Sequence, residues 1–142
     1  MQAYDDTTRK IQNAFMEFFS KKELHEITVK GICEKVDIPR TSFYYYFADV
    51  YEVLESIEDL LIENCAERNK SFVSYRFKKD GYSKEGHFRA TLLYIKENDF
   101  WYRTLLNKSK DGLFIYKWKK VIKRDFLKKF RYEKIDLKEE EL

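Results

Sequence analysis

Only one proline and four glycines occur in the 142 residues of this chain. Turns depend heavily on these two residue types, and a β-sandwich or barrel needs turn residues about every 8–12 positions. Their scarcity therefore favours long helices. Hydrophobic residues make up 44% of the sequence, which is enough for a buried core, so the 37% of charged residues does not indicate disorder. We expect an all-α protein.

Several classes of protein are disfavoured by what the sequence lacks. Cys33 and Cys65 form no disulfide framework, and no Cys/His spacing indicates zinc. There is no glycine-rich phosphate loop and no Ser/His/Asp or metal-ligand constellation, so we expect neither an enzyme nor a cofactor or metal. The N-terminus has no apolar signal region, and no apolar run approaches the ~18–20 residues of a membrane span. We expect a cytoplasmic protein without a membrane partner.

Charge is distributed unevenly along the chain. Residues 1–50 hold 7 basic and 8 acidic groups, whereas residues 71–131 hold 17 basic and 6 acidic groups. A basic surface can bind nucleic acid. The lysines between Lys117 and Lys129 are also typical of the solvent-exposed face of a last helix. Alternatively, their positive charge attracts an acidic effector or adds long-range electrostatic attraction to DNA.

The first forty-six residues predict three helices. Apolar residues recur at helical spacing from Ile11 to Phe19, and Thr7 or Thr8 is available as N-cap. Thr28 can cap a short second helix that ends near Val36. The sequence thus predicts two helices, separated by a polar stretch, before residue 37.

A turn then leads to the third helix. Asp37 is a plausible turn residue because aspartate tolerates the left-handed conformation. Pro39 suits the first turn of a helix that runs from Arg40 to about Tyr46. Two short helices joined by a turn of three or four residues are typical of a helix-turn-helix, whose last helix reads DNA in the major groove.

The rest of the chain also predicts helices. Asp49 can cap a fourth helix that reaches at least Cys65 and continues toward Tyr75. Residues 79–83 form the clearest linker. We expect further helices around Phe88–Ile95, Phe100–Leu106 and Phe114–Phe130, with a polar loop over 107–112.

The N-terminal segment resembles the DNA-binding domain of the TetR/AcrR family of transcriptional regulators. The likeness covers about residues 7–60 and rests on Thr8-Arg9, Phe18-Phe19, Ile27-Thr28-Val29, Ile32-Cys33 and the run Ser42-Phe43-Tyr44-Tyr45-Tyr46-Phe47. The resemblance implies a helix-turn-helix domain over 1–47 and a helical effector-binding and dimerisation domain over 48–142.

The resemblance also implies which residues touch DNA. Thr28 and Lys30 would hold phosphate at the second helix, and Arg40, Thr41 and Ser42 would open the reading helix in the major groove. Tyr44 matches a tyrosine that hydrogen-bonds phosphate, Tyr45 faces outward, and Tyr46 is either a core residue or a phosphate contact. The expected DNA-binding residues are Thr28, Lys30, Arg40, Thr41, Ser42, Tyr44, Tyr45 and Tyr46.

Some positions depart from the family pattern. Glu23 and Asp37 stand where glycine is usual, and Thr41 replaces a glycine that lets the reading helix approach DNA closely. Val50 stands where a lysine commonly begins the fourth helix. These differences put the operator sequence in doubt rather than the fold.

By the same resemblance, aromatic residues of the C-terminal part would line an effector cavity, although aromatic residues at helical spacing are more often simple core residues. The expected effector contacts are Phe88, Leu92, Trp101, Tyr102 and Trp118. The family usually dimerises through its last two helices, and this chain ends soon after its seventh predicted helix. We expect either a short member with another interface or a fragment.

The sequence thus predicts a repressor that binds a pseudo-palindromic operator on duplex DNA as a homodimer and is released by a small molecule. The alternative is a TetR-like coregulator or ligand-binding module that no longer reads DNA, which the −1 charge of residues 1–50 favours. The operator, the regulated genes and the effector are not encoded in any motif.

Overall fold

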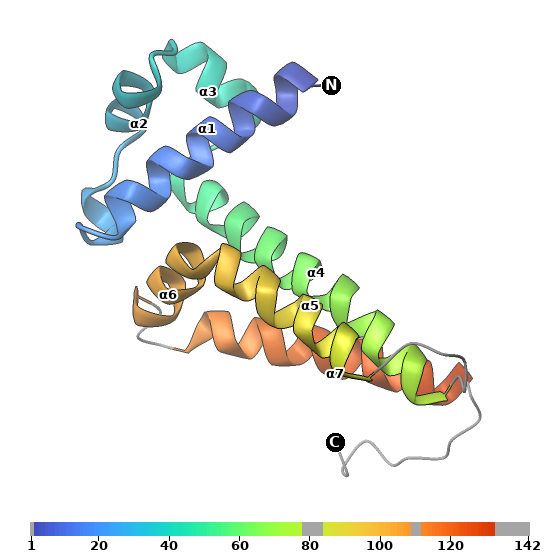
Figure 1. Cartoon of the computed structure of the whole chain (residues 1–142). Helices are drawn as coiled ribbons and strands as arrows, with labels where there is room; N and C mark the ends of the chain where they lie inside the picture. The colour runs from blue at the N-terminus through green and yellow to red at the C-terminus, as the bar shows by residue number, and fades with distance from the viewer. Residues whose placement is uncertain (1, 78–83, 109–111, 133–142) are drawn as a thin grey trace. The chain divides into compact units, whose positions relative to one another are not determined.

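The structure is a computed structural model that describes residues 2–77, 84–108 and 112–132 (Figure 1). Within these ranges the chain forms α-helices and one 3₁₀ helix, η1, and no strand, which confirms the expected all-α fold. The helices are α1 (Gln2–Phe19), η1 (Leu24–Glu26), α2 (Val29–Val36), α3 (Arg40–Tyr46), α4 (Val50–Phe77), α5 (Lys84–Glu97), α6 (Asp99–Lys108) and α7 (Leu113–Tyr132). The expected linker over 79–83 lies outside the described residues.

The chain divides into two compact units, residues 1–59 and 60–142. Helix α4 runs through the boundary between them, so the first unit includes the start of α4 as well as the helix-turn-helix. The domain boundary expected after Phe47 stays a prediction.

Helix α1 supplies one wall of the first unit's core. Ile11 and Phe15 are fully buried, as the apolar stripe predicts, and Met16, which the stripe does not include, is fully buried as well. The expectation that Thr7 or Thr8 caps this helix is wrong, because α1 begins at Gln2 and both threonines lie inside it. Acidic residues near a helix N-terminus favour the longer helix. One of them, Asp6, also pairs with Lys10 at 3.2 Å one turn later.

Helix α2 ends in the turn that defines the motif. Asp37 has φ 60° and ψ 55°, which is the left-handed conformation expected for it. The N–H groups of Asp37 and Ile38 both donate to the carbonyl of Cys33, so this turn satisfies the helix end. Ile32 and Cys33 are buried beneath it.

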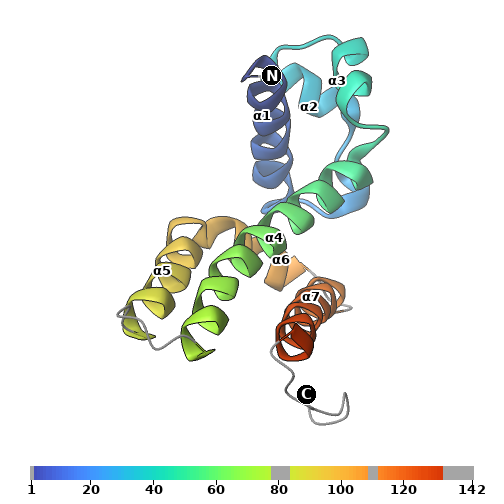
Figure 2. The ribbon, with the colours of Figure 1, turned by 90° about the vertical axis from the view of Figure 1, so that its right-hand side faces the viewer.

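Helix α3 follows after only three residues. Pro39 is its N-cap, and its carbonyl accepts the N–H of Ser42 at 3.0 Å. Phe43 is fully buried and its ring lies 6.0 Å from that of Phe47. In Figures 1 and 2, α1, α2 and α3 lie beside one another, and α2 packs on both neighbours. Buried aromatic residues and a left-handed turn thus hold the helix-turn-helix together.

The second unit has its own aromatic core. The centroid of the Tyr102 ring lies 6.2 Å from that of Tyr94 on α5 and 5.4 Å from that of Trp118 on α7. The hydroxyl of Tyr102 donates a hydrogen bond of 2.9 Å to the carbonyl of Leu61 on α4. Arg124 of α7 lies 3.7 Å from Glu63 of α4. Tyr102 therefore joins the later part of α4 to the three helices that follow it.

No helix in the described ranges combines the length and the hydrophobicity that crossing a bilayer requires.

The left-handed turn gives the first prediction. Glycine adopts φ 60° without strain, so Asp37→Gly will leave the protein unchanged or stabilise it by up to about 1 kcal/mol. A β-branched side chain is strained there, so Asp37→Val will lower the free energy of unfolding by about 1–2 kcal/mol or more. Urea unfolding followed by circular dichroism measures both variants. Equal stability of the two would show that the left-handed turn is absent in solution.

Candidate nucleic-acid interface

The exposed side of α3 opposes the side that carries Phe43. Arg40 and Thr41 are exposed, and Tyr44 and Tyr45 expose 54% and 78% of their surface. The rings of Tyr44 and Phe43 are in edge-to-face contact, with their centroids 5.5 Å apart. The rings of Tyr45 and Tyr46 are in the same kind of contact, with centroids 5.0 Å apart. Each ring therefore has one aromatic neighbour and a large exposed surface. A helix that displays guanidinium and hydroxyl groups in this way can donate hydrogen bonds to DNA.

Arg40 holds the first position of α3. Within the part of the chain that the structure describes, no carboxylate forms an ion pair with it. Burial raises the pKa of the Cys33 thiol, and the positive charge of Arg40 partly offsets that increase. Cys33 therefore remains a protonated core residue, and the Arg40 guanidinium stays available to a partner.

Helix α2 presents its N-terminus on the same motif. The hydroxyl oxygen of Thr28 accepts the N–H of Gly31 at 3.0 Å, which confirms Thr28 as N-cap. A Cβ on residue 31 would lie only 3.1 Å from that oxygen, so the glycine leaves room for the cap. Because the cap uses Thr28 as acceptor, the hydroxyl proton remains free to donate to a phosphate.

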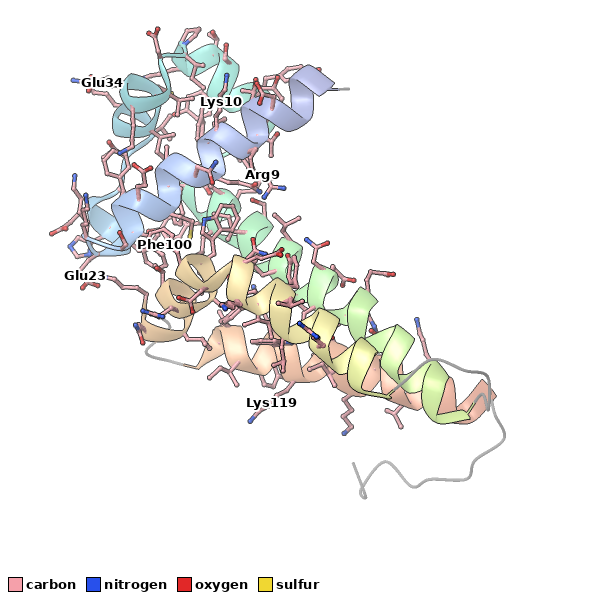
Figure 3. All side chains as sticks on the ribbon, in the orientation of Figure 1. Arg9, Lys10, Glu23, Glu34, Phe100 and Lys119 are labelled. Carbon is pink, nitrogen blue, oxygen red and sulfur yellow. The ribbon has the colours of Figure 1, made fainter. Side chains whose placement is uncertain are left out.

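The remaining cations of the motif are already partnered. Lys30 lies 4.0 Å from Glu34, a loose surface pair, and Figure 3 shows Glu34 projecting outward from α2. Lys35 is bonded to Glu17 and lies 4.9 Å from the centre of the Phe18 ring. The Lys35 ammonium, hydrogen-bonded to Glu17, lowers the pKa of that carboxyl. Lys35 thus ties α2 to α1, and Lys30 is the exposed lysine at the start of α2.

A groove of about 350 Å³ lies beside α3. It brings together four expected DNA-binding residues of α3 and two residues that the sequence analysis did not place at the interface. Its lining residues are Thr7, Ile38, Thr41, Ser42, Tyr45 and Tyr46. We call it the hydroxyl groove, since five of the six side chains carry a hydroxyl group. Thr7 was read as a helix cap, although its position one turn before Ile11 on the buried stripe of α1 also points toward the motif.

The expected effector residues lie in the second unit and are only partly brought together. Tyr102 and Trp118 are in ring contact, with Phe114 5.7 Å beyond Trp118. Leu92 is exposed on α5, and Trp101 is half-buried one residue before Tyr102. The side chain of Phe88 lies outside the described residues. Among the described residues, no group of three or more acidic, cysteine or histidine side chains is placed to hold a metal ion.

Two known proteins are similar to this chain over most of its length. One is the protein named uncharacterized HTH-type transcriptional regulator YxbF of Bacillus subtilis (strain 168), at 22% identity over 118 residues, 83% of this chain. The other is the HTH-type dhaKLM operon transcriptional activator DhaS of Lactococcus lactis subsp. lactis (strain IL1403), at 24% identity over 136 residues, 92% of this chain. The chain spans 30% of the Bacillus protein and 68% of the Lactococcus protein. No family model and no solved structure matches it.

Substitutions at Thr28 can distinguish its role as helix N-cap from its proposed role as a phosphate contact. Thr28→Ala will lower the free energy of unfolding by about 1 kcal/mol because the cap is lost. Thr28→Asp keeps a capping oxygen and will leave stability near wild type, but its charge repels phosphate, so DNA binding will weaken. Thr28→Ser retains both functions and serves as control.

Urea unfolding and fluorescence-anisotropy titration of a labelled duplex measure the two effects on the same samples. If Thr28→Asp bound DNA as tightly as Thr28→Ser, the residue would be a cap alone.

Proposed function

We propose that this protein is a TetR/AcrR-like transcriptional regulator that binds duplex DNA through α3. The observation that carries the proposal is the helix-turn-helix itself: a three-residue turn, a buried Phe43, Tyr45 exposed on the opposite side of α3, and Arg40 exposed at the first position of α3. Similarity to two regulators of the helix-turn-helix type supports the same function.

In this proposal each residue of the interface has a distinct task. Arg40 donates to a base edge in the major groove, where a guanidinium matches the two acceptors of guanine. Thr28 and Lys30 hold one phosphate at the start of α2, and Tyr44 donates to another. Thr41, Ser42 and Tyr46 complete the contact beside them.

We further propose a homodimer on a pseudo-palindromic operator, since two linked reading heads gain avidity that one lacks. Repression and release by a small molecule remain part of the proposal and rest on the family resemblance. The indole N–H of Trp118, which has no hydrogen-bond partner among the described residues, is the donor that a bound effector would meet in the aromatic core. The Lactococcus relative is named an activator, so the sign of regulation is decided by reporter expression with and without the protein.

A coregulator that binds protein rather than DNA is the second candidate. It is favoured by the net charge of −1 over residues 1–50 and by the carboxylates that occupy the start of α4. The Ala48 N–H donates to Glu52 at 2.6 Å, and the Glu52 N–H donates to Asp49 at 2.9 Å. These N–H groups are then unavailable to a phosphate. Affinity for DNA that is weak and the same for every sequence would favour this candidate.

The decisive experiment is anisotropy titration of the DNA upstream of the protein's own gene, with excess competitor DNA and a series of salt concentrations. Arg40→Ala will weaken binding to the preferred site by about 1–3 kcal/mol and relax discrimination at one base position. The slope of log affinity against log salt will change little, because the side chain that is lost contacts a base edge rather than a phosphate.

The matched control is Lys119→Ala, which removes the same charge from an exposed position on α7 (Figure 3). We expect it to bind DNA like wild type. If Lys119→Ala and Arg40→Ala weakened binding equally, general positive charge rather than α3 would be responsible. Absence of binding to this fragment would move the search to genome-wide selection of bound DNA, and failure there would favour the coregulator.

A further inference from the structure

We propose that the hydroxyl groove holds a phosphate of the DNA backbone and that Thr7 of α1 donates to it. This inference rests on the proposed function and adds a contact from a helix outside the helix-turn-helix. The groove is formed where the first turns of α1 lie beside α3, an arrangement visible in both Figure 1 and Figure 2.

The side chains along α1 change character at this groove. Ile11 is fully buried in the core of the first unit. Thr7 lies one helical turn earlier on the same face, and it is only half-buried. The stripe therefore becomes polar at the point where α1 leaves the core and borders the groove. A surface that merely continued the core would carry an apolar residue at this position.

The chemistry of the groove suits a phosphate more than an apolar ligand. Thr7, Thr41 and Ser42 offer aliphatic hydroxyls, and Tyr45 and Tyr46 offer phenols. All five can donate to an oxygen acceptor. None of the lining residues is acidic, so no fixed charge opposes an anion. The neighbouring acid on α1, Asp6, is paired with Lys10.

The position of the groove agrees with this role. Thr41 and Tyr45 are on the exposed side of α3, one turn apart, and both line the groove. A DNA strand that follows α3 in the major groove therefore passes over it. Contacts to phosphate set the register of a reading helix without selecting sequence. Thr7 is accordingly a positioning contact, and Arg40 remains the residue expected to select a base.

The test uses Thr7→Val, which removes the hydroxyl and keeps the β-branched shape, and Thr7→Ser, which restores a hydroxyl. Anisotropy titrations are made with the preferred DNA fragment and with a scrambled fragment, at several salt concentrations. Thr7→Val will bind both fragments at least about 10-fold more weakly, the effect of one hydrogen bond to a charged acceptor. Thr7→Ser will bind like wild type. The salt slope will not change, because no cation is removed.

A second variant guards against an effect on folding. Thr7→Asp places a negative charge in the groove, near the N-terminus of α1, where an acidic residue does not destabilise a helix. It will lose at least about tenfold in affinity through repulsion of phosphate, while thermal unfolding stays close to wild type.

The outcomes separate this inference from the proposed function. Weakening by Arg40→Ala with full binding by both Thr7→Val and Thr7→Asp would overturn the groove contact and leave DNA reading by α3 intact. A loss by Thr7→Val on the preferred fragment alone would replace the phosphate with a base contact and so overturn the proposal as stated. If the wild-type protein bound no duplex DNA, the proposed function itself would fail, and the groove contact with it.

Discussion

Burial of Phe43 under the left-handed turn at Asp37 is the constraint on which the rest of the first unit depends. Helix α3 has seven residues, fewer than an isolated helix needs to be stable in water. Its conformation is therefore imposed by packing. Once the Phe43 ring is in the core and Asp37 has set the direction of the chain, helical geometry places Tyr45, two residues after Phe43, on the opposite side of α3. Arg40 is exposed at the first position of the helix. The interface is a consequence of that core.

Electrostatics explain how a segment of net charge −1 can still present a face suited to the anion-binding role that we propose. Several carboxylates of the first unit are engaged with partners: Asp6 with Lys10, Glu17 with Lys35, and Glu52 with a backbone N–H. The exposed side of α3 carries Arg40 and neutral hydroxyl donors instead. Total charge is thus a poor guide to this surface. The basic excess of residues 71–131 belongs mainly to the second unit, where the exposed lysines of α7 surround its buried side.

The features that the sequence predicted well are those that depend on interactions between residues close together in the sequence. The cap at Thr28, the left-handed Asp37 and the limits of α3 each depend on residues within a few positions of one another. The start of α1 was placed too late because Thr7 and Thr8 are good caps in isolation, whereas a helix already running from Gln2 needs none there. The hydroxyl groove could not be read from spacing, since it exists only when Thr7 and Tyr45, far apart in sequence, are brought together by the core. The exposure of Leu92 depends on packing for the same reason.

The start of α4 shows how the departures from the family pattern fit together. Asp49 and Glu52 accept the N–H groups of the loop and of the first turn, and Val50 is buried between them instead of offering the lysine usual in the family. A helix N-terminus closed by its own carboxylates cannot hold phosphate as an open one does. If this chain reads DNA, its backbone contacts must come from elsewhere on the first unit. The N-terminal part of α1 provides such a place, because Thr7 opens onto the groove that α3 lines. In the proposed interface, the hydroxyl contact at α1 therefore supplies a phosphate contact that the closed start of α4 does not offer.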